Sequence, residues 1–114
     1  MAPRRLERDI QFEIRVASAQ VPGLVLWRNN TGVAEQKGHT VRYGLCRGSS
    51  DLIGVLAPTG RMVALECKTD TGRLTEEQRM FLELVRAKGG FAAVVRSVEE
   101  FLEAMKRAAI GENE

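Results

Sequence analysis

The chain has 114 residues, of which 44% are hydrophobic, a composition that suits one domain over residues 1–114 and excludes a disordered chain. Its longest apolar runs, at residues 24–27 and 52–57, are far shorter than the roughly 20 residues of a membrane-spanning helix. No apolar segment follows the arginines near the N-terminus, so we expect no secretory signal and a protein that works in the cytosol without a membrane partner.

The net charge of +2 is unevenly distributed, with −3 on residues 98–114 and +5 on residues 1–97. Thirteen of the 17 basic residues are arginines, whose planar guanidinium suits bidentate phosphate contacts. This charge permits a nucleic-acid partner but fits an ordinary solvated surface equally well. Cys46 and Cys67 lack the spacing of a metal knuckle and are expected as free thiols, and one histidine cannot form a zinc cluster.

Apolar residues recur at helical spacing from Leu6 to Ala17, which predicts an amphipathic helix over residues 4–19. A Pro-Gly turn ends this helix, and residues 24–27 are predicted as a short strand in which the size of Trp27 favours burial. The polar stretch 28–42 contains paired asparagines and two glycines, and therefore predicts a surface loop or a loose hairpin.

A hairpin is predicted next, with strands at residues 51–57 and 61–68. Thr75 and Gln78 then match the capping box that begins a helix, and this helix should end before Gly89.

The C-terminal part should contain a strand at residues 91–95 and a helix at residues 98–109, which Ser97 caps. Because a helix precedes it, the strand at 91–95 should run parallel to an earlier strand. The predicted class is therefore α/β, a mixed β-sheet flanked by helices in the order α-β-β-β-α-β-α.

The predicted hairpin holds the residues that suggest chemistry. Glu66 and Lys68 share a strand face, and Asp51 lies at the start of the partner strand. Two neighbouring carboxylates repel each other unless a cation lies between them, and Mg²⁺ prefers such oxygen ligands together with water. A divalent ion there could activate water and neutralise a phosphodiester, while Lys68 stabilises the transition state. An exposed Glu-x-Lys pair, however, is more often a solvated ion pair.

The shared face also sets the hairpin register. If Asp51 lies opposite Glu66, then Leu56 faces Arg61 and residues 57–60 form a four-residue loop. A three-residue loop at 58–60 is equally compatible with the turn residues, but it would put Asp51 on the wrong face. We therefore predict the four-residue loop, or a β-bulge with the same parity.

The hairpin and its flanks carry a wider pattern: residues 44–54 with Gly-Ser-Ser-Asp, then Leu-Glu-Cys-Lys at 65–68, Gly-Arg-Leu-Thr at 72–75, and Gln78. Over about residues 7–104 the chain resembles the VRR-NUC domain, a family of the PD-(D/E)XK nuclease superfamily, in its stand-alone phage or bacterial form. The resemblance implies a restriction-endonuclease-like core. One departure is Ser50, where many relatives have a proline that adds turn stiffness but no chemistry.

The resemblance also implies roles for individual residues. Asp51, Glu66 and the backbone carbonyl of Cys67 would bind the metal, Mg²⁺ with Mn²⁺ as a substitute. Lys68 would be the catalytic lysine, and Gln78 a supporting residue whose capping role would compete for the same amide. Glu7 matches the glutamate that such families place on the first helix better than Glu13 does. The residues themselves, apart from the resemblance, suggest as candidates for DNA contact Arg28, Asn30, Tyr43, Arg47 and Arg73. Turn chemistry, however, explains Arg28, Asn29 and Asn30 equally well.

The leading hypothesis is a structure-selective DNA endonuclease that leaves a 5′-phosphate. Small relatives of this type resemble Holliday-junction resolvases, which act as homodimers, and two symmetric cuts suit a two-fold dimer. Two alternatives stay open: a non-catalytic DNA-binding module that retains the fold, and a nuclease subunit of a larger restriction or repair complex.

Overall fold

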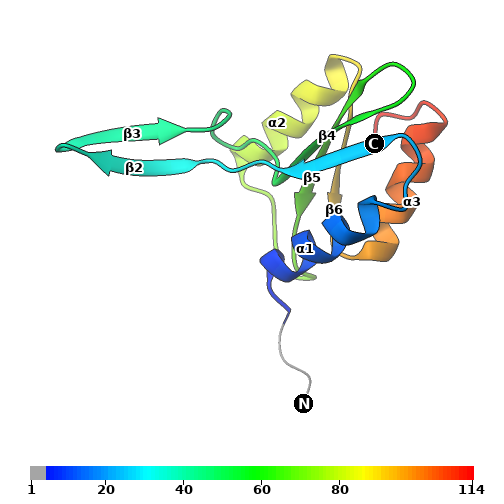
Figure 1. The fold of residues 1–114 in the computed structure, drawn as a ribbon, viewed down its shortest axis with the longest axis horizontal. Coiled ribbons are helices and arrows are strands. Elements are labelled where there is room, and N and C mark those ends of the chain that lie inside the picture. The colour runs from blue at the N-terminus through cyan, green and yellow to red at the C-terminus, as the bar shows by residue number, and fades with distance from the viewer. Residues whose placement is uncertain (1–4) are drawn as a thin grey trace.

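The computed structural model describes residues 5–114, in which five consecutive strands lie between the first two helices (Figure 1). Their bounds are α1 Glu7–Ser18, β1 Leu24–Arg28, β2 Gly32–Gln36, β3 His39–Tyr43, β4 Leu52–Leu56, β5 Arg61–Cys67, α2 Glu76–Ala87, β6 Phe91–Val95 and α3 Val98–Ala109. The predicted α/β class is confirmed. The helix predicted over residues 4–19 begins only at Glu7, and Arg4 lies outside the described residues.

Four strands form a mixed sheet in the order β1-β4-β5-β6. β4 is antiparallel to β1 and to β5, whereas β5 and β6 are parallel. The predicted parallel pairing of residues 91–95 is therefore confirmed. Parallel strands need a long connection between them, and α2 provides it.

The register of the β4–β5 hairpin places the two predicted metal-binding carboxylates side by side. Leu52 pairs with Leu65 and Leu56 with Arg61, which leaves residues 57–60 as a four-residue loop and confirms the predicted register. One step beyond Leu52, Asp51 comes opposite Glu66 on the same face of the sheet.

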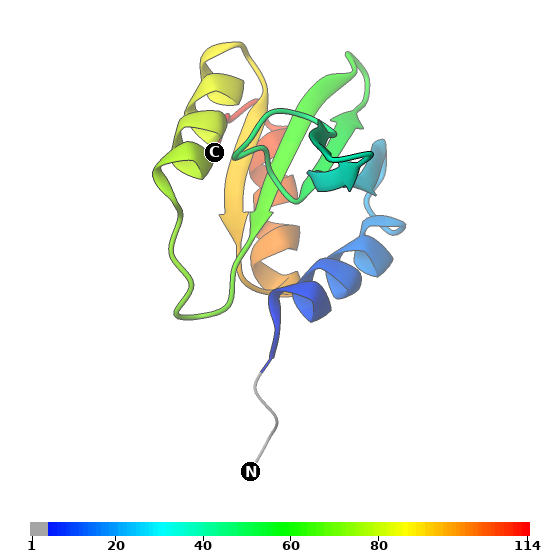
Figure 2. The same ribbon diagram turned by 90° about the vertical axis from the view of Figure 1, so that its left-hand side faces the viewer.

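Helices cover both faces of the sheet (Figure 2). On one face, Ile14 of α1 and Phe101 of α3 are buried in the larger core cluster. On the other face, Phe81, Leu82 and Val85 of α2 pack over the sheet. Because the helices pack against the two faces of the sheet in this way, the start of α1 and the start of α2 both lie at the same end of β5. None of the helices within residues 5–114 is long and apolar enough to cross a membrane.

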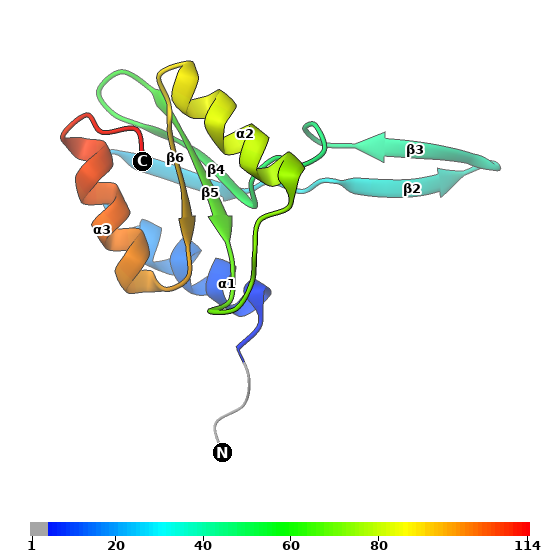
Figure 3. The same cartoon turned by 180° about the vertical axis from the view of Figure 1, so that it is seen from behind.

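The predicted element order omits two strands. The stretch predicted as a loop or loose hairpin forms β2 and β3, a two-stranded sheet of its own that stands away from the four-stranded sheet (Figures 1 and 3). Of the two alternatives, the hairpin is therefore the correct one. Neither of its faces is buried, so the sequence shows no apolar alternation that would have marked its strands.

The prediction that Trp27 is buried is wrong, because 45% of this residue is exposed. β1 is an edge strand, and α2 packs against β5 and β6 rather than against β1. The face of β1 that carries Trp27 and the 61%-exposed Val25 therefore has no helix over it. Phe81, by contrast, lies on the face of α2 that packs against the sheet and is buried.

Candidate active site

Three carboxylates converge beside the end of β5. Glu7 is the first residue of α1, Asp51 directly precedes β4, and Glu66 is the last residue but one of β5. One oxygen from each lies within 4.8 Å of the others. Carboxylates this close repel one another unless a proton or a cation lies among them. The structure thus brings the first residue of α1 beside two carboxylates of the β4–β5 hairpin.

The backbone of β5 fixes the direction of Asp51. The amide of Cys67 donates a hydrogen bond of 2.8 Å to Asp51 Oδ2. This bond ties the carboxylate to the strand that carries Glu66, and it leaves the second oxygen of Asp51 available to the cluster.

Glu66 is almost completely buried, with 1% of its surface exposed, and its Oε2 has no hydrogen-bond partner among the described residues. Burial, followed by the charge of Asp51, raises the pKa of Glu66 from 4.5 to about 9, although Lys68 acts in the opposite direction. A buried oxygen without a partner is costly unless something satisfies it. A proton can do so in the free protein, and a divalent cation fits this cluster of hard oxygen donors.

Lys68 is the cation nearest to the cluster. It is 8% exposed, and its Nζ lies 3.7 Å from Glu7 Oε1 and 4.0 Å from Glu66 Oε1. These distances allow attraction to both carboxylates, while the ammonium stays beyond direct hydrogen-bond length from either of them. The amino group therefore retains donors for a third partner.

The side-chain amide of Gln78 serves both the cap of α2 and the carboxylate of Glu66. Its Oε1 accepts the backbone N–H of Thr75 at 2.9 Å, which completes the capping box of α2, and its Nε2 donates to Glu66 Oε1 at 3.1 Å. The expectation that the two roles would compete is wrong, because they use opposite ends of the amide. The cap requires an acceptor, so the NH₂ group is left to face Glu66.

Asn29 has a part in the site that the sequence left undecided between turn chemistry and function. Its side chain donates to Ser49 Oγ at 2.8 Å and to the Ser50 carbonyl at 2.9 Å, and its backbone N–H donates to the Asp51 carbonyl at 2.8 Å. These three bonds hold the turn that carries Asp51.

Arg96, the residue after β6, supports the loop that follows Lys68. Its guanidinium donates to the carbonyls of Thr69 and Gly72, the latter at 2.8 Å, and Gly72 lies against the Lys68 side chain. Sequence reasoning missed this residue. The parallel pairing of β5 with β6 was the available signal, because it puts the residue after β6 beside the loop after β5.

Cys67 offers the cluster only its backbone. Its thiol is fully buried, and burial raises the pKa of that thiol far above its usual range. The thiol is therefore neither a reactive group nor an available metal ligand. Both cysteines are free, as predicted.

The predicted DNA-contact residues are exposed and lie around the cluster rather than in it. Arg28 ends β1, Asn30 follows it, and Tyr43 ends β3 with 43% of its surface exposed. Arg73 lies in the loop before α2. Arg47 forms a surface ion pair with Glu77 of α2 at 3.3 Å, so one acid already neutralises it.

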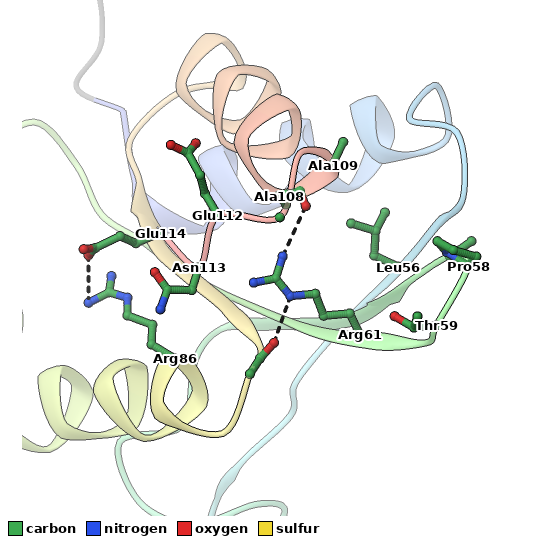
Figure 4. Close-up of a pocket in the computed structure, with 13 residues that line it drawn as sticks. Leu56, Pro58, Thr59, Arg61, Arg86, Ala108, Ala109, Glu112, Asn113 and Glu114 are labelled. Atoms are coloured by element: carbon green, nitrogen blue, oxygen red, sulfur yellow. Dashed lines mark hydrogen bonds and ion pairs between the residues drawn. The ribbon is translucent and has the colours of Figure 1, made fainter.

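A cavity of about 800 Å³ lies at the opposite end of the sheet, beside the β4–β5 loop (Figure 4). Arg61 donates there to the carbonyls of Gly89 and Ala108, and Arg86 pairs with Glu114 at 3.3 Å. The loop after α2 and the end of α3 thus satisfy Arg61, and Glu114 pairs with Arg86. This cavity lies where the last residues of the chain pack beside the sheet, and none of the clustered carboxylates lines it.

The family comparison agrees with this geometry. The model of the VRR-NUC domain matches residues 34–99, a segment that contains Asp51, Glu66, Lys68 and Gln78 but not Glu7. No curated protein matches the chain. Because the matched segment covers more than half of the 114 residues, the chain belongs to the VRR-NUC domain family of PD-(D/E)XK nucleases.

Proposed function

We propose that this protein is a divalent-metal-dependent endonuclease that hydrolyses phosphodiester bonds in structured DNA. The observation that carries the proposal is the cluster of Glu7, Asp51 and Glu66, in which a buried oxygen of Glu66 has no hydrogen-bond partner among residues 5–114. Carboxylate oxygens at this spacing are suitable ligands for Mg²⁺, and Mn²⁺ should substitute for it.

The ligands would be Asp51, Glu66 and the carbonyl of Cys67, with Glu7 at the edge of the site. When bound, the ion would neutralise charge on the phosphodiester and lower the pKa of water. Lys68 would donate to a non-bridging phosphate oxygen and stabilise the negative charge that develops during attack. Gln78 would hold the Glu66 carboxylate in place through its amide. The product would carry a 5′-phosphate.

DNA contacts would surround the cluster. Arg28, Asn30 and Tyr43 lie on the side of β1 and β3, and Arg73 lies before α2. Arg28 and Arg73 have no carboxylate within 4 Å among residues 5–114, so both can bind phosphate. Arg47 would first have to leave Glu77.

A homodimer is the proposed working form, and a four-way junction is the proposed preferred substrate. One carboxylate cluster of this kind is present in the described part of the chain, whereas resolving a junction needs two symmetric cuts. A two-fold dimer supplies both cuts from identical sites.

A cleavage panel tests the function. Duplex, single-stranded, flap and four-way-junction DNA would be incubated with Mg²⁺, with Mn²⁺ or with EDTA. We expect metal-dependent cleavage, strongest on the junction, which Asp51→Asn abolishes. The matched control is Glu13→Gln, which removes a carboxylate from α1 that pairs with Arg5 outside the cluster. Binding of branched DNA without cleavage under any of these conditions would instead support the non-catalytic module.

A further inference from the structure

The hairpin β2–β3 is the part of the fold that the carboxylate cluster leaves unexplained. Within the described part of the chain its strands pair only with each other, and all of β3 and most of β2 are exposed (Figure 1). Two-stranded hairpins that lack a packed face are marginally stable in water. A projecting hairpin of this kind is therefore a candidate for contact with a partner.

Both ends of the hairpin are attached beside the carboxylate cluster. On the entry side, β1 ends at Arg28, and the next residue, Asn29, bonds to the Asp51 carbonyl. On the exit side, residues 44–50 lead directly into Asp51, and Gly48 packs against the backbone of Glu77 on α2. Any polymer seated at Asp51 therefore passes the base of the hairpin.

The tip of the hairpin presents a cation. Gln36 pairs with His39, so the turn consists of Lys37 and Gly38 alone. Both residues have positive φ, 51° and 77°, as in the two-residue turns that match the twist of antiparallel strands. Lys37 adopts this less favourable backbone conformation at an exposed turn, and among residues 5–114 its amino group has no carboxylate within 4 Å.

The charge of the hairpin complements a polyanion. Arg28 stands at its base, Lys37 at its tip and Arg42 in β3, against the single acid Glu35. Within residues 5–114, no carboxylate lies within 4 Å of any of these three cations. Exposed amide and hydroxyl groups, which also bind phosphates, line the same strands in Gln36 and Thr40.

We propose that hairpin β2–β3 is a DNA-binding arm that contacts the backbone on one side of the cleaved bond. This inference rests on the proposed nuclease function and names a surface for its substrate. A two-stranded ribbon has the dimensions to enter the major groove. Five-residue strands extend about 16 Å, at about 3.3 Å per residue. At about 3.4 Å per nucleotide along one strand, the arm reaches roughly five nucleotides from the cut.

Salt-dependent binding tests the arm separately from cleavage. The affinity of Lys37→Gln/Arg42→Gln for a fluorescent 30-base-pair duplex and for a four-way junction would be measured in EDTA at several salt concentrations. Each lost phosphate contact should lower the slope of log affinity against log salt by about 0.9, so about 1.8 for the pair. At 0.1 M salt this corresponds to ten- to hundredfold weaker binding. Hydroxyl-radical footprinting should show protection shortened by about five nucleotides on one side.

The matched control is Lys88→Gln/Lys106→Gln, which removes the same charge at the C-terminal ends of α2 and α3, away from the cluster. Its slope and footprint should equal those of the wild type. An arm variant whose slope and footprint are also unchanged would overturn the proposal.

The mass of each variant in solution distinguishes DNA from a second copy of the chain. Val33 and Val41, exposed at 52% and 42%, could instead meet a partner protomer. Loss of dimer in the arm variant, with an unchanged salt slope, would make the arm a protomer interface and refute DNA contact. Failure of the wild type to cleave any DNA would refute the nuclease proposal. The DNA-binding role of the arm would still be decided by the change in the salt slope of the arm variant.

Discussion

Replacing Glu66 by glutamine should stabilise the metal-free protein at neutral and higher pH. Burial and the nearby Asp51 raise the Glu66 pKa from 4.5 to about 9, so the folded state keeps a proton that the unfolded state releases above pH 4.5. The stability from this group is therefore complete below pH 4.5 and is lost as the pH rises through about 9. Each pH unit in this window costs about 1.4 kcal/mol, which makes the loss at pH 7 about 3 kcal/mol.

Urea unfolding in EDTA at pH 5, 6, 7 and 8 measures this cost. The free energies of unfolding of the wild type and Glu66→Gln should lie closest together at pH 5, then diverge by about 1.4 kcal/mol per pH unit in favour of the variant. Glu13→Gln, an exposed carboxylate on α1, is the control and should follow the wild type. Mn²⁺ should stabilise the wild type at pH 8 but not Glu66→Gln. Parallel pH profiles for the wild type and Glu66→Gln would refute the assignment of a protonated, buried Glu66.

Substitutions at three further residues test the surroundings of the carboxylate cluster. Lys68→Ala should retain Mn²⁺ binding by calorimetry but cleave at least a hundredfold more slowly, about 3 kcal/mol of transition-state stabilisation; an equal loss of metal affinity would contradict its catalytic role. Asn29→Ala should weaken Mn²⁺ affinity with little change in melting temperature, because the turn that directs Asp51 loosens. Unchanged affinity would show that this turn keeps its conformation without Asn29. Gln78→Glu should keep the helix cap and lose cleavage, whereas Gln78→Ala should also cost about 1 kcal/mol of stability; equal stability losses would show that the cap does not depend on Gln78.

The register of the hairpin that carries the site was predictable from the sequence, because the expected metal site requires Asp51 and Glu66 to share a face. Turn residues alone allowed two loops between β4 and β5, and only one of them placed Asp51 and Glu66 on the same face. The observed pairing of Leu56 with Arg61 is the register that this requirement selects. The helices were predictable for a local reason, since Thr75 and Ser97 cap α2 and α3 with their own side chains.

The elements that the sequence described poorly are those whose surroundings lie elsewhere in the chain. Trp27 was expected in the core from its size, but its exposure depends on which strands α2 covers. The hairpin β2–β3 buries neither face, so its strands give no alternation between polar and apolar residues. Asn29 and Arg96 act on turns at least 20 residues away, and no local pattern contains those partners.

The free-energy cost of holding three carboxylates together and the affinity proposed for a divalent cation have the same physical origin. Lys68 approaches Glu7 and Glu66 but does not come within hydrogen-bond length of them, and Gln78 satisfies only one oxygen of Glu66. A closer lysine would neutralise the carboxylates and compete with a metal ion for them. A second amide on Oε2 would remove the need for a ligand there. The residues around Glu66 therefore hold its carboxylate in a fixed direction and leave one of its oxygens unsatisfied, which the proposed divalent cation would correct.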